Sequence, residues 1–272
     1  MKLSSLIAFL FLTNLAIAQD IQTEKSSDAE LVKQLMKEDL GIRTFSFADV
    51  VANSSGKKVI TFDAENTAHK VVSAAIKLAI ISSIEELNHE ISPVNKLRRI
   101  NEASRYFEEL LLKKLNAMEH LECTIPTNAQ GKQQRSGYPD LKILHLASGS
   151  IFYLDPKLFE QKSKASSLRT FYFEPKTRTR KIQDDAVHLL LGISHDGVDG
   201  NWTFGNWNLV DLSKLKVRLK VEFQTSNKTL YRKANIIQSG EWKFSSHSSF
   251  KGFSQSSFIV SLPLLWQLIT SM

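Results

Sequence analysis

Two acidic residues and a lysine are the side chains best suited to chemistry in this sequence. Asp140 precedes one apolar run, and Asp155, Pro156 and Lys157 follow the next. Residues two apart in a strand share a face, so Asp155 and Lys157 point the same way, and a Ser-Gly-Ser turn folds Asp140 opposite Asp155. Two carboxylates held together repel unless a cation joins them, and Mg²⁺ suits such a pair. Lys157 would then position a water or stabilise charge on a phosphate.

Pro156 and a competing motif bear on this hypothesis. Pro156 lacks an amide hydrogen, so it must face an unpaired edge or the strand's end, and its free carbonyl is a further metal ligand. Glu174 and Lys176 form a second acid-x-lysine pattern after another apolar run. Using it would pair Asp140 with a strand that is not its hairpin partner, so Asp155 is the preferred carboxylate.

The pattern resembles the PD-(D/E)xK nuclease superfamily, which has the restriction-endonuclease-like fold. The resemblance implies that Asp140 and Asp155 bind magnesium and that Lys157 assists hydrolysis of a phosphodiester. Many members add an acidic residue from the preceding helix, as a metal ligand and catalytic residue. Glu108 is the candidate here because it lies nearer the apolar side of its predicted helix; Glu102 and Glu65 remain alternatives.

Apolar periodicity predicts an α/β fold. The expected helices begin at Asp63, run over 93–121, and begin again at Asp184-Asp185 with AVHLLLGI; the expected strands are 141–147, 151–154, 168–173 and 215–223. This order gives a mixed central β-sheet flanked by helices, with an N-terminal helical extension. By the resemblance above, it is a restriction-endonuclease-like core.

The ends of the chain differ from its middle. Lys2, an apolar stretch and Ala16-Ile17-Ala18 predict a signal peptide over 1–18, and hence a secreted or periplasmic protein. The expected division continues with a loosely structured leader over 19–62, a nuclease-like α/β domain over 63–245 and an apolar tail over 246–272. The tail would bring the protein to a membrane only if it acts as an anchor.

Charge favours a polyanionic partner. The net charge is +7 and the pI about 9.3. Lys176, Arg178, Arg180 and Lys181 are expected to form a loop that grips phosphates, the alternative being a solvated turn.

These observations favour a metal-dependent endonuclease that hydrolyses phosphodiester bonds, with DNA as the expected substrate. Mg²⁺ is the expected cofactor and no organic cofactor is expected. A homodimer would supply the two sites that cutting both strands requires. The alternatives are a non-catalytic exported domain that binds nucleic acid or another polyanion, and a structural protein of the cell envelope.

Overall fold

The computed structural model describes residues 28–37, 40–167, 171–220 and 225–239. The chain divides into two compact units, one ending at Val221 and the other beginning at Glu222. The predicted signal peptide and apolar tail lie outside the described residues.

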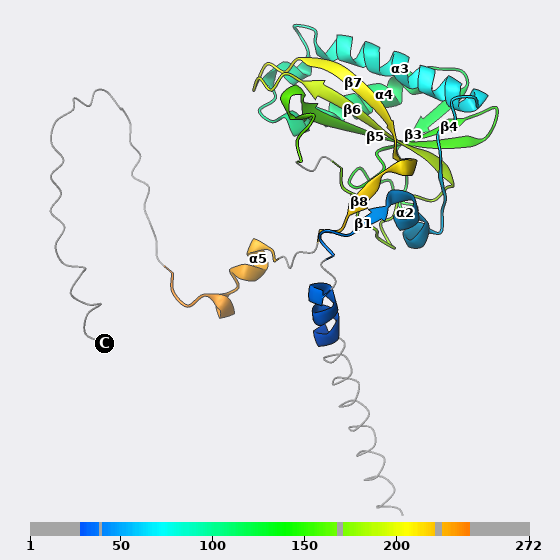
Figure 1. Cartoon of the computed structure of the whole chain (residues 1–272). Helices are drawn as coiled ribbons and strands as arrows, with labels where there is room; N and C mark the ends of the chain where they lie inside the picture. The colour runs from blue at the N-terminus through cyan, green and yellow to red at the C-terminus, as the bar shows by residue number, and fades with distance from the viewer. Residues whose placement is uncertain (1–27, 38–39, 168–170, 221–224, 240–272) are drawn as a thin grey trace, which may run out of the picture. The chain divides into compact units, whose positions relative to one another are not determined.

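A six-stranded mixed sheet forms the centre of the first unit (Figure 1). Its strands are β2 (Val59–Ile60), β3 (Leu121–Thr124), β4 (Leu141–His145), β5 (Ser150–Glu160), β6 (Ala186–His195) and β7 (Phe204–Asp211). The order is β2-β6-β5-β4-β3, and β7 also pairs with β6. β4 and β5 form the predicted antiparallel hairpin, whereas β5 and β6 are parallel, so the predicted mixed sheet is confirmed.

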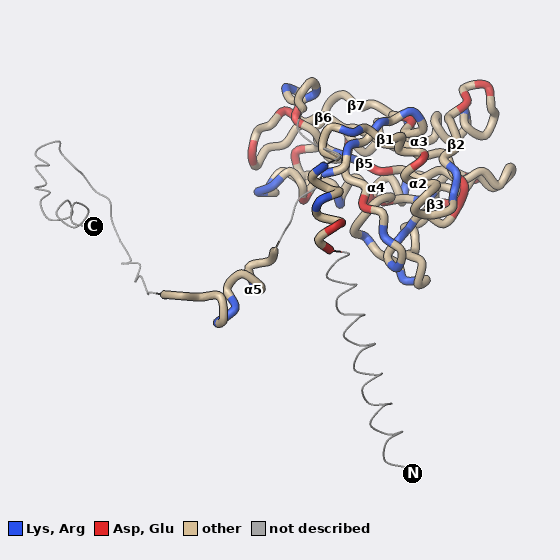
Figure 2. Tube along the Cα trace, turned by 60° about the horizontal axis from the view of Figure 1, so that its bottom comes forward, with Lys and Arg blue, Asp and Glu red and all other residues tan. Residues whose placement is uncertain are grey.

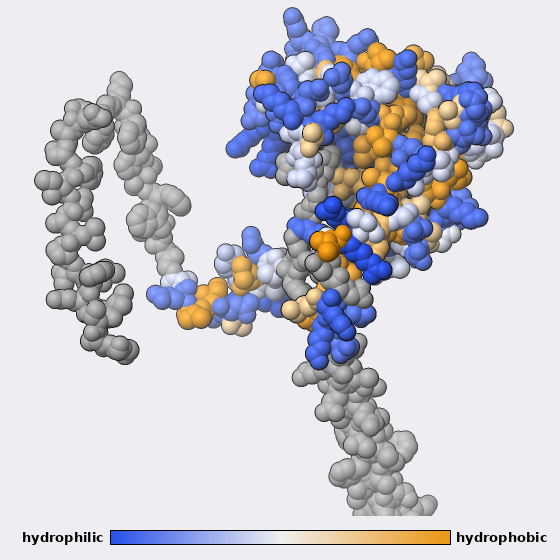
Figure 3. All heavy atoms as spheres, in the orientation of Figure 1, coloured by the Kyte–Doolittle hydropathy of each residue, from blue (hydrophilic) through white to orange (hydrophobic). Residues whose placement is uncertain are grey.

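Two helices cover one face of this sheet, α3 (Thr67–Leu87) and α4 (Ser104–Asn116). The Asn66 side chain caps α3 by accepting from the amide of His69, and Phe107 and Leu111 from α4 are fully buried against the sheet. α3 is the one described helix long and apolar enough to cross a membrane. Its buried face packs in the core here, as expected for a central helix of an α/β protein. Figure 3 shows apolar side chains in the middle of a face that is otherwise mostly hydrophilic.

The opposite face of the sheet is covered by α2 (Phe47–Ser55) and by a two-stranded ribbon of β1 (Thr44–Ser46) and β8 (Lys216–Arg218). Phe47 is fully buried in a second apolar cluster that includes Tyr138 and Tyr153. The expectation that residues 19–62 are loosely structured is therefore wrong for 44–60, because α2 contributes core side chains and β2 joins the main sheet.

The helix predicted after Asp184-Asp185 is also wrong, because AVHLLLGI forms the central strand β6. Most of its side chains are buried, and a strand covered on both faces has a continuous apolar run without the two-residue alternation. Such a run cannot be distinguished from a buried helix by periodicity.

The other observed elements differ less from the predicted ones. The helix predicted over 93–121 is split into two 3₁₀ turns, Pro93–Lys96 and Ile100–Glu102, followed by α4. No strand forms over 171–173, and 168–170 lie outside the described residues. β8 covers three residues of the strand predicted over 215–223. The second unit contains the short helix α5 (Asn227–Leu230) and a 3₁₀ turn over Lys233–Asn235.

Phe47 should be essential for the layer that α2 forms. Phe47→Ala removes a fully buried ring, and we expect it to lower the free energy of unfolding by about 3–5 kcal/mol in urea titrations. Leu78→Ala on the exposed side of α3 is the control and should cost less than about 0.5 kcal/mol. Equal losses in the two variants would show that α2 is not part of the cooperative core.

Candidate functional site

The structure brings Asp140, Asp155 and Lys157 together where β4 and β5 separate. Their last paired residues are Leu141 and Leu154, so the two carboxylates lie one step beyond the end of the hairpin ladder. Lys157 Nζ lies 2.7 Å from Asp155 Oδ2 and 3.4 Å from Asp140 Oδ2. The two-residue spacing on β5 therefore places the lysine beside both acids, as the sequence predicts.

Burial and mutual charge shift the pKa values of Asp155 and Lys157. Asp155 is only 1% exposed, and Oδ2 makes no hydrogen bond beyond its ion pair with Lys157. Burial, followed by the negative charge of Asp140, raises the pKa of Asp155 to about 7, although Lys157 opposes the rise. Burial lowers the pKa of Lys157, but the two carboxylates outweigh it and the pKa is raised overall. Lys157 is therefore an ammonium ion at neutral pH.

Glu108 is the helical carboxylate that lies close enough to interact with this trio. Burial raises its pKa, and the charge of Asp140 adds to the rise, whereas Lys157 is among the cations that lower it. Glu102 and Glu65 are exposed, and Glu65 pairs instead with Lys70 at 3.1 Å. Of the three predicted candidates, Glu108 is thus the one whose charge interacts with Asp140.

Pro156 lies within β5 and is buried. It pairs with β6 at Leu191 but lies past the last residue of β5 that pairs with β4. At Pro156 the edge of β5 that faced β4 has no strand partner among the described residues, and such a position tolerates a residue without an amide hydrogen.

The predicted phosphate-gripping loop does not form one surface. Lys176 is exposed and pairs with Glu174 at 2.8 Å, Arg178 is exposed, and Arg180 donates to the carbonyl of Ser54 at 3.2 Å. Lys181 is only 2% exposed, so grouping it with a solvent-facing loop is wrong.

Lys181 belongs to the carboxylate site instead. Its Nζ donates to the main-chain carbonyls of Gln134 and Arg135 at 3.2 and 3.4 Å, which ties down the segment leading to Asp140. Burial lowers its pKa, and Asp140, Asp155 and Glu108 act against that shift. Nothing in the basic run distinguishes Lys181 from its neighbours except that it directly precedes the buried Ile182.

Tyrosines support the trio from the same face of the sheet. Tyr138 and Tyr153 each lie two residues before one of the carboxylates, and both are buried. The Tyr138 hydroxyl lies 2.8 Å from Nδ1 of His188, which is fully buried on β6. Burial lowers the pKa of His188 to about 3, so this ring is neutral at neutral pH.

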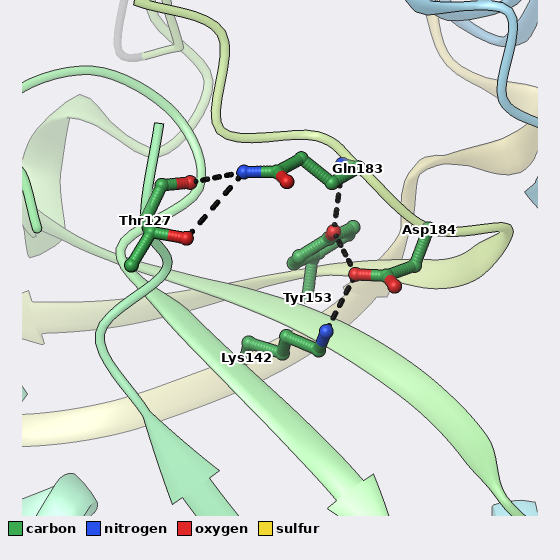
Figure 4. A network of polar contacts seen from close by, with 5 residues as sticks. All are labelled: Thr127, Lys142, Tyr153, Gln183 and Asp184. Atoms are coloured by element: carbon green, nitrogen blue, oxygen red, sulfur yellow. Dashed lines mark hydrogen bonds and ion pairs between the residues drawn. The ribbon is translucent and has the colours of Figure 1, made fainter. Parts of the chain in front are cut away.

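A polar network fixes the other tyrosine and the start of β6 (Figure 4). Asp184 Oδ2 accepts from both Tyr153 Oη and Lys142 Nζ at 2.7 Å. The Gln183 amide donates to Tyr153 Oη at 3.1 Å, and its side chain donates to the carbonyl of Thr127 at 2.7 Å. The segment that carries Lys181 is therefore anchored to β4 and β5.

The donor set fits a hard divalent cation. Asp140 and Asp155 supply carboxylate oxygens, and one oxygen of the buried Asp155 has no partner except Lys157. Among the described residues, no three or more His, Cys, Asp or Glu side chains cluster as metal ligands. Mg²⁺ commonly takes only one or two protein carboxylates and keeps water or phosphate as its other ligands, so two carboxylates suffice.

Asp155 should make stability depend on pH. Its folded-state pKa is raised to about 7, so its contribution to stability is fully present below its unfolded value of about 4 and is lost as the pH rises through 7. We expect wild type to lose free energy of unfolding relative to Asp155→Asn between about pH 4 and 7, measured by urea titration in EDTA. The exposed Asp199→Asn variant should follow wild type. A pH-independent difference between Asp155→Asn and wild type would contradict the raised pKa.

Sequence similarity relates this chain to a family of restriction enzymes. The family model of the Type II restriction enzyme MjaV family matches residues 40–234. The chain is also 30% identical over 212 residues to the Type II restriction enzyme MjaV of Methanocaldococcus jannaschii, covering 74% of this chain and 91% of that protein. The match includes α2, the whole sheet and every residue of the trio. This protein belongs to the Type II restriction enzyme MjaV family.

Proposed function

We propose that this protein is a metal-dependent endonuclease that hydrolyses phosphodiester bonds in DNA. The observation that carries the proposal is the convergence of Asp140, Asp155 and Lys157 at the separation of β4 and β5, in a chain of this family. The name of the relative, a Type II restriction enzyme, supports DNA as the substrate.

The residues of the site have distinct roles in this proposal. Asp140 and Asp155 would hold the divalent ion, with the Pro156 carbonyl as a further ligand. Glu108 would add a nearby negative charge that also attracts the ion. When bound, Mg²⁺ would supply Lewis-acid polarisation of the phosphate and lower the pKa of a water. Lys181 would keep the segment before Asp140 in place.

In the proposed mechanism, Lys157 donates hydrogen bonds and does not act as a base. Because its pKa is raised, its ammonium group is poorly suited to accept a proton from water. It is suited to donate hydrogen bonds to a phosphate oxygen or to the attacking water, where it offsets the negative charge that develops in the transition state.

Removing Lys157 tests this role. We expect Lys157→Ala to lower the cleavage rate of plasmid DNA in Mg²⁺ by about 100-fold or more, the range found when one charge-stabilising donor is removed. Asp155→Asn should be similarly inactive, and EDTA should abolish cleavage by wild type.

Lys77→Ala on the exposed side of α3 and Asp199→Asn in an exposed loop are the matched controls and should cleave like wild type. Thermal unfolding of every variant separates a loss of chemistry from a loss of folding. Unchanged cleavage by folded Lys157→Ala would remove the proposed site.

We also propose that the protein is exported, on the strength of its N-terminal pattern of Lys2, an apolar stretch and Ala16-Ile17-Ala18. Mass spectrometry of the protein purified from its source should find a mature chain that begins at Gln19. A chain that retains Met1 and residues 2–18 would contradict export through a cleaved signal peptide.

A further inference from the structure

The β1–β8 ribbon presents one strongly basic edge. Lys214, Lys216 and Arg218 are exposed, whereas Leu215 and Val217 between them pack against the second apolar cluster. No acidic residue occurs between Asp211 and Glu222 in the sequence, and within the described residues these three cations form no ion pair. Figure 2 shows Lys and Arg segments beside β1 on the folded body. The cations therefore remain available for a polyanionic partner.

The partner strand adds hydroxyl groups to the same face. Thr44 lies opposite Arg218 and Ser46 opposite Lys216, and directly opposed residues of an antiparallel pair share a face. An open hollow of about 510 Å³ borders this strand and α2, and its lining includes Arg43, Thr44 and Ser46, with Asp49 as its acidic member. Lysine, arginine and hydroxyl side chains are the usual donors to DNA phosphates.

The ribbon is built onto the layer that supports the proposed site. The amide of Phe47 donates to the carbonyl of Leu215 at 2.9 Å, and the Phe47 ring packs edge-on against Tyr138 at 5.7 Å between ring centroids. Tyr138 lies two residues before Asp140. Figure 1 shows β1, β8 and α2 together on the side of the sheet opposite α3.

The carboxylates face the same side as this layer. Phe152 and Leu154 pack in the cluster beneath α3 and α4, whereas Tyr153 packs in the cluster of α2. By the two-residue alternation of a strand, Asp155 and Lys157 share the face of Tyr153. The basic ribbon and the trio thus belong to one side of the sheet.

We propose that the β1–β8 ribbon binds the phosphate backbone of duplex DNA and holds it against the face that carries the trio. This inference rests on the proposed function and adds the surface that positions the substrate. A two-stranded ribbon can also enter the major groove, but cations and hydroxyls on one face favour phosphate contacts, which do not depend on sequence.

The test measures DNA binding without cleavage. The full chain is titrated in EDTA with a fluorescent 30-base-pair duplex over a series of salt concentrations. Each lost phosphate contact should lower the salt-dependence slope by about 0.9, so Lys216→Gln/Arg218→Gln should lower it by about 2 and weaken binding of unrelated sequences equally. Lys77→Gln/Lys113→Gln removes the same charge from exposed positions of α3 and α4, and its slope should stay near that of wild type.

The outcomes separate this inference from the proposed function. If wild type binds and cuts DNA but the ribbon variant and the helix variant have equal salt slopes, the ribbon does not bind DNA. The proposed nuclease function is then unaffected. Wild type that neither binds nor cuts duplex DNA overturns both. For the ribbon variant in Mg²⁺, a raised KM with an unchanged kcat supports the inference, and a lowered kcat at saturating DNA contradicts it.

Discussion

Burial of the Asp155 carboxylate is the constraint around which the rest of the sheet is arranged. A charge taken out of water is costly unless it is paired, and the partner must come from a position that the backbone holds firmly. Lys157 meets this need from the same strand, two residues away. Asp140 approaches the same ammonium group from the neighbouring strand, so two carboxylates compete for one cation. The fold therefore holds two carboxylates closer together than they would lie in water, and their repulsion contributes to the raised pKa of Asp155.

Holding two like charges together requires rigid supports on both strands, and the second apolar cluster supplies them. Tyr138 and Tyr153 precede the two carboxylates, and both contact the ring of His188. Phe47 packs against this group, and the Asp184 network fixes the hydroxyl of Tyr153. The layer formed by residues 44–55 thus serves the site although it contributes no group to it.

The part of the site that depends on strand geometry could be predicted from the sequence, and the part that depends on tertiary packing could not. Two-residue alternation and a short turn are enough to bring Asp140, Asp155 and Lys157 together, and helical spacing is enough to favour Glu108. β6 was missed because a strand buried on both faces has no alternation to detect. Lys181 was misplaced because four nearby cations have the same local pattern, and only the tertiary approach of the Gln134 and Arg135 carbonyls to Lys181 distinguishes it.

The position of β2 has a consequence for how the protein is made. β2 pairs with the first residues of β6, from Val59 opposite Ala186, so an early segment of the chain is completed by one from its last third. Among the strands that the structure describes, β6 is also the only one that pairs with β5 beyond Leu154, where Asp155 and Lys157 lie. A ribosome must therefore release most of the polypeptide before the sheet can close. While it is being synthesised, the nascent chain therefore lacks the strand that flanks Asp155 and Lys157 until residues 186–195 have left the ribosome.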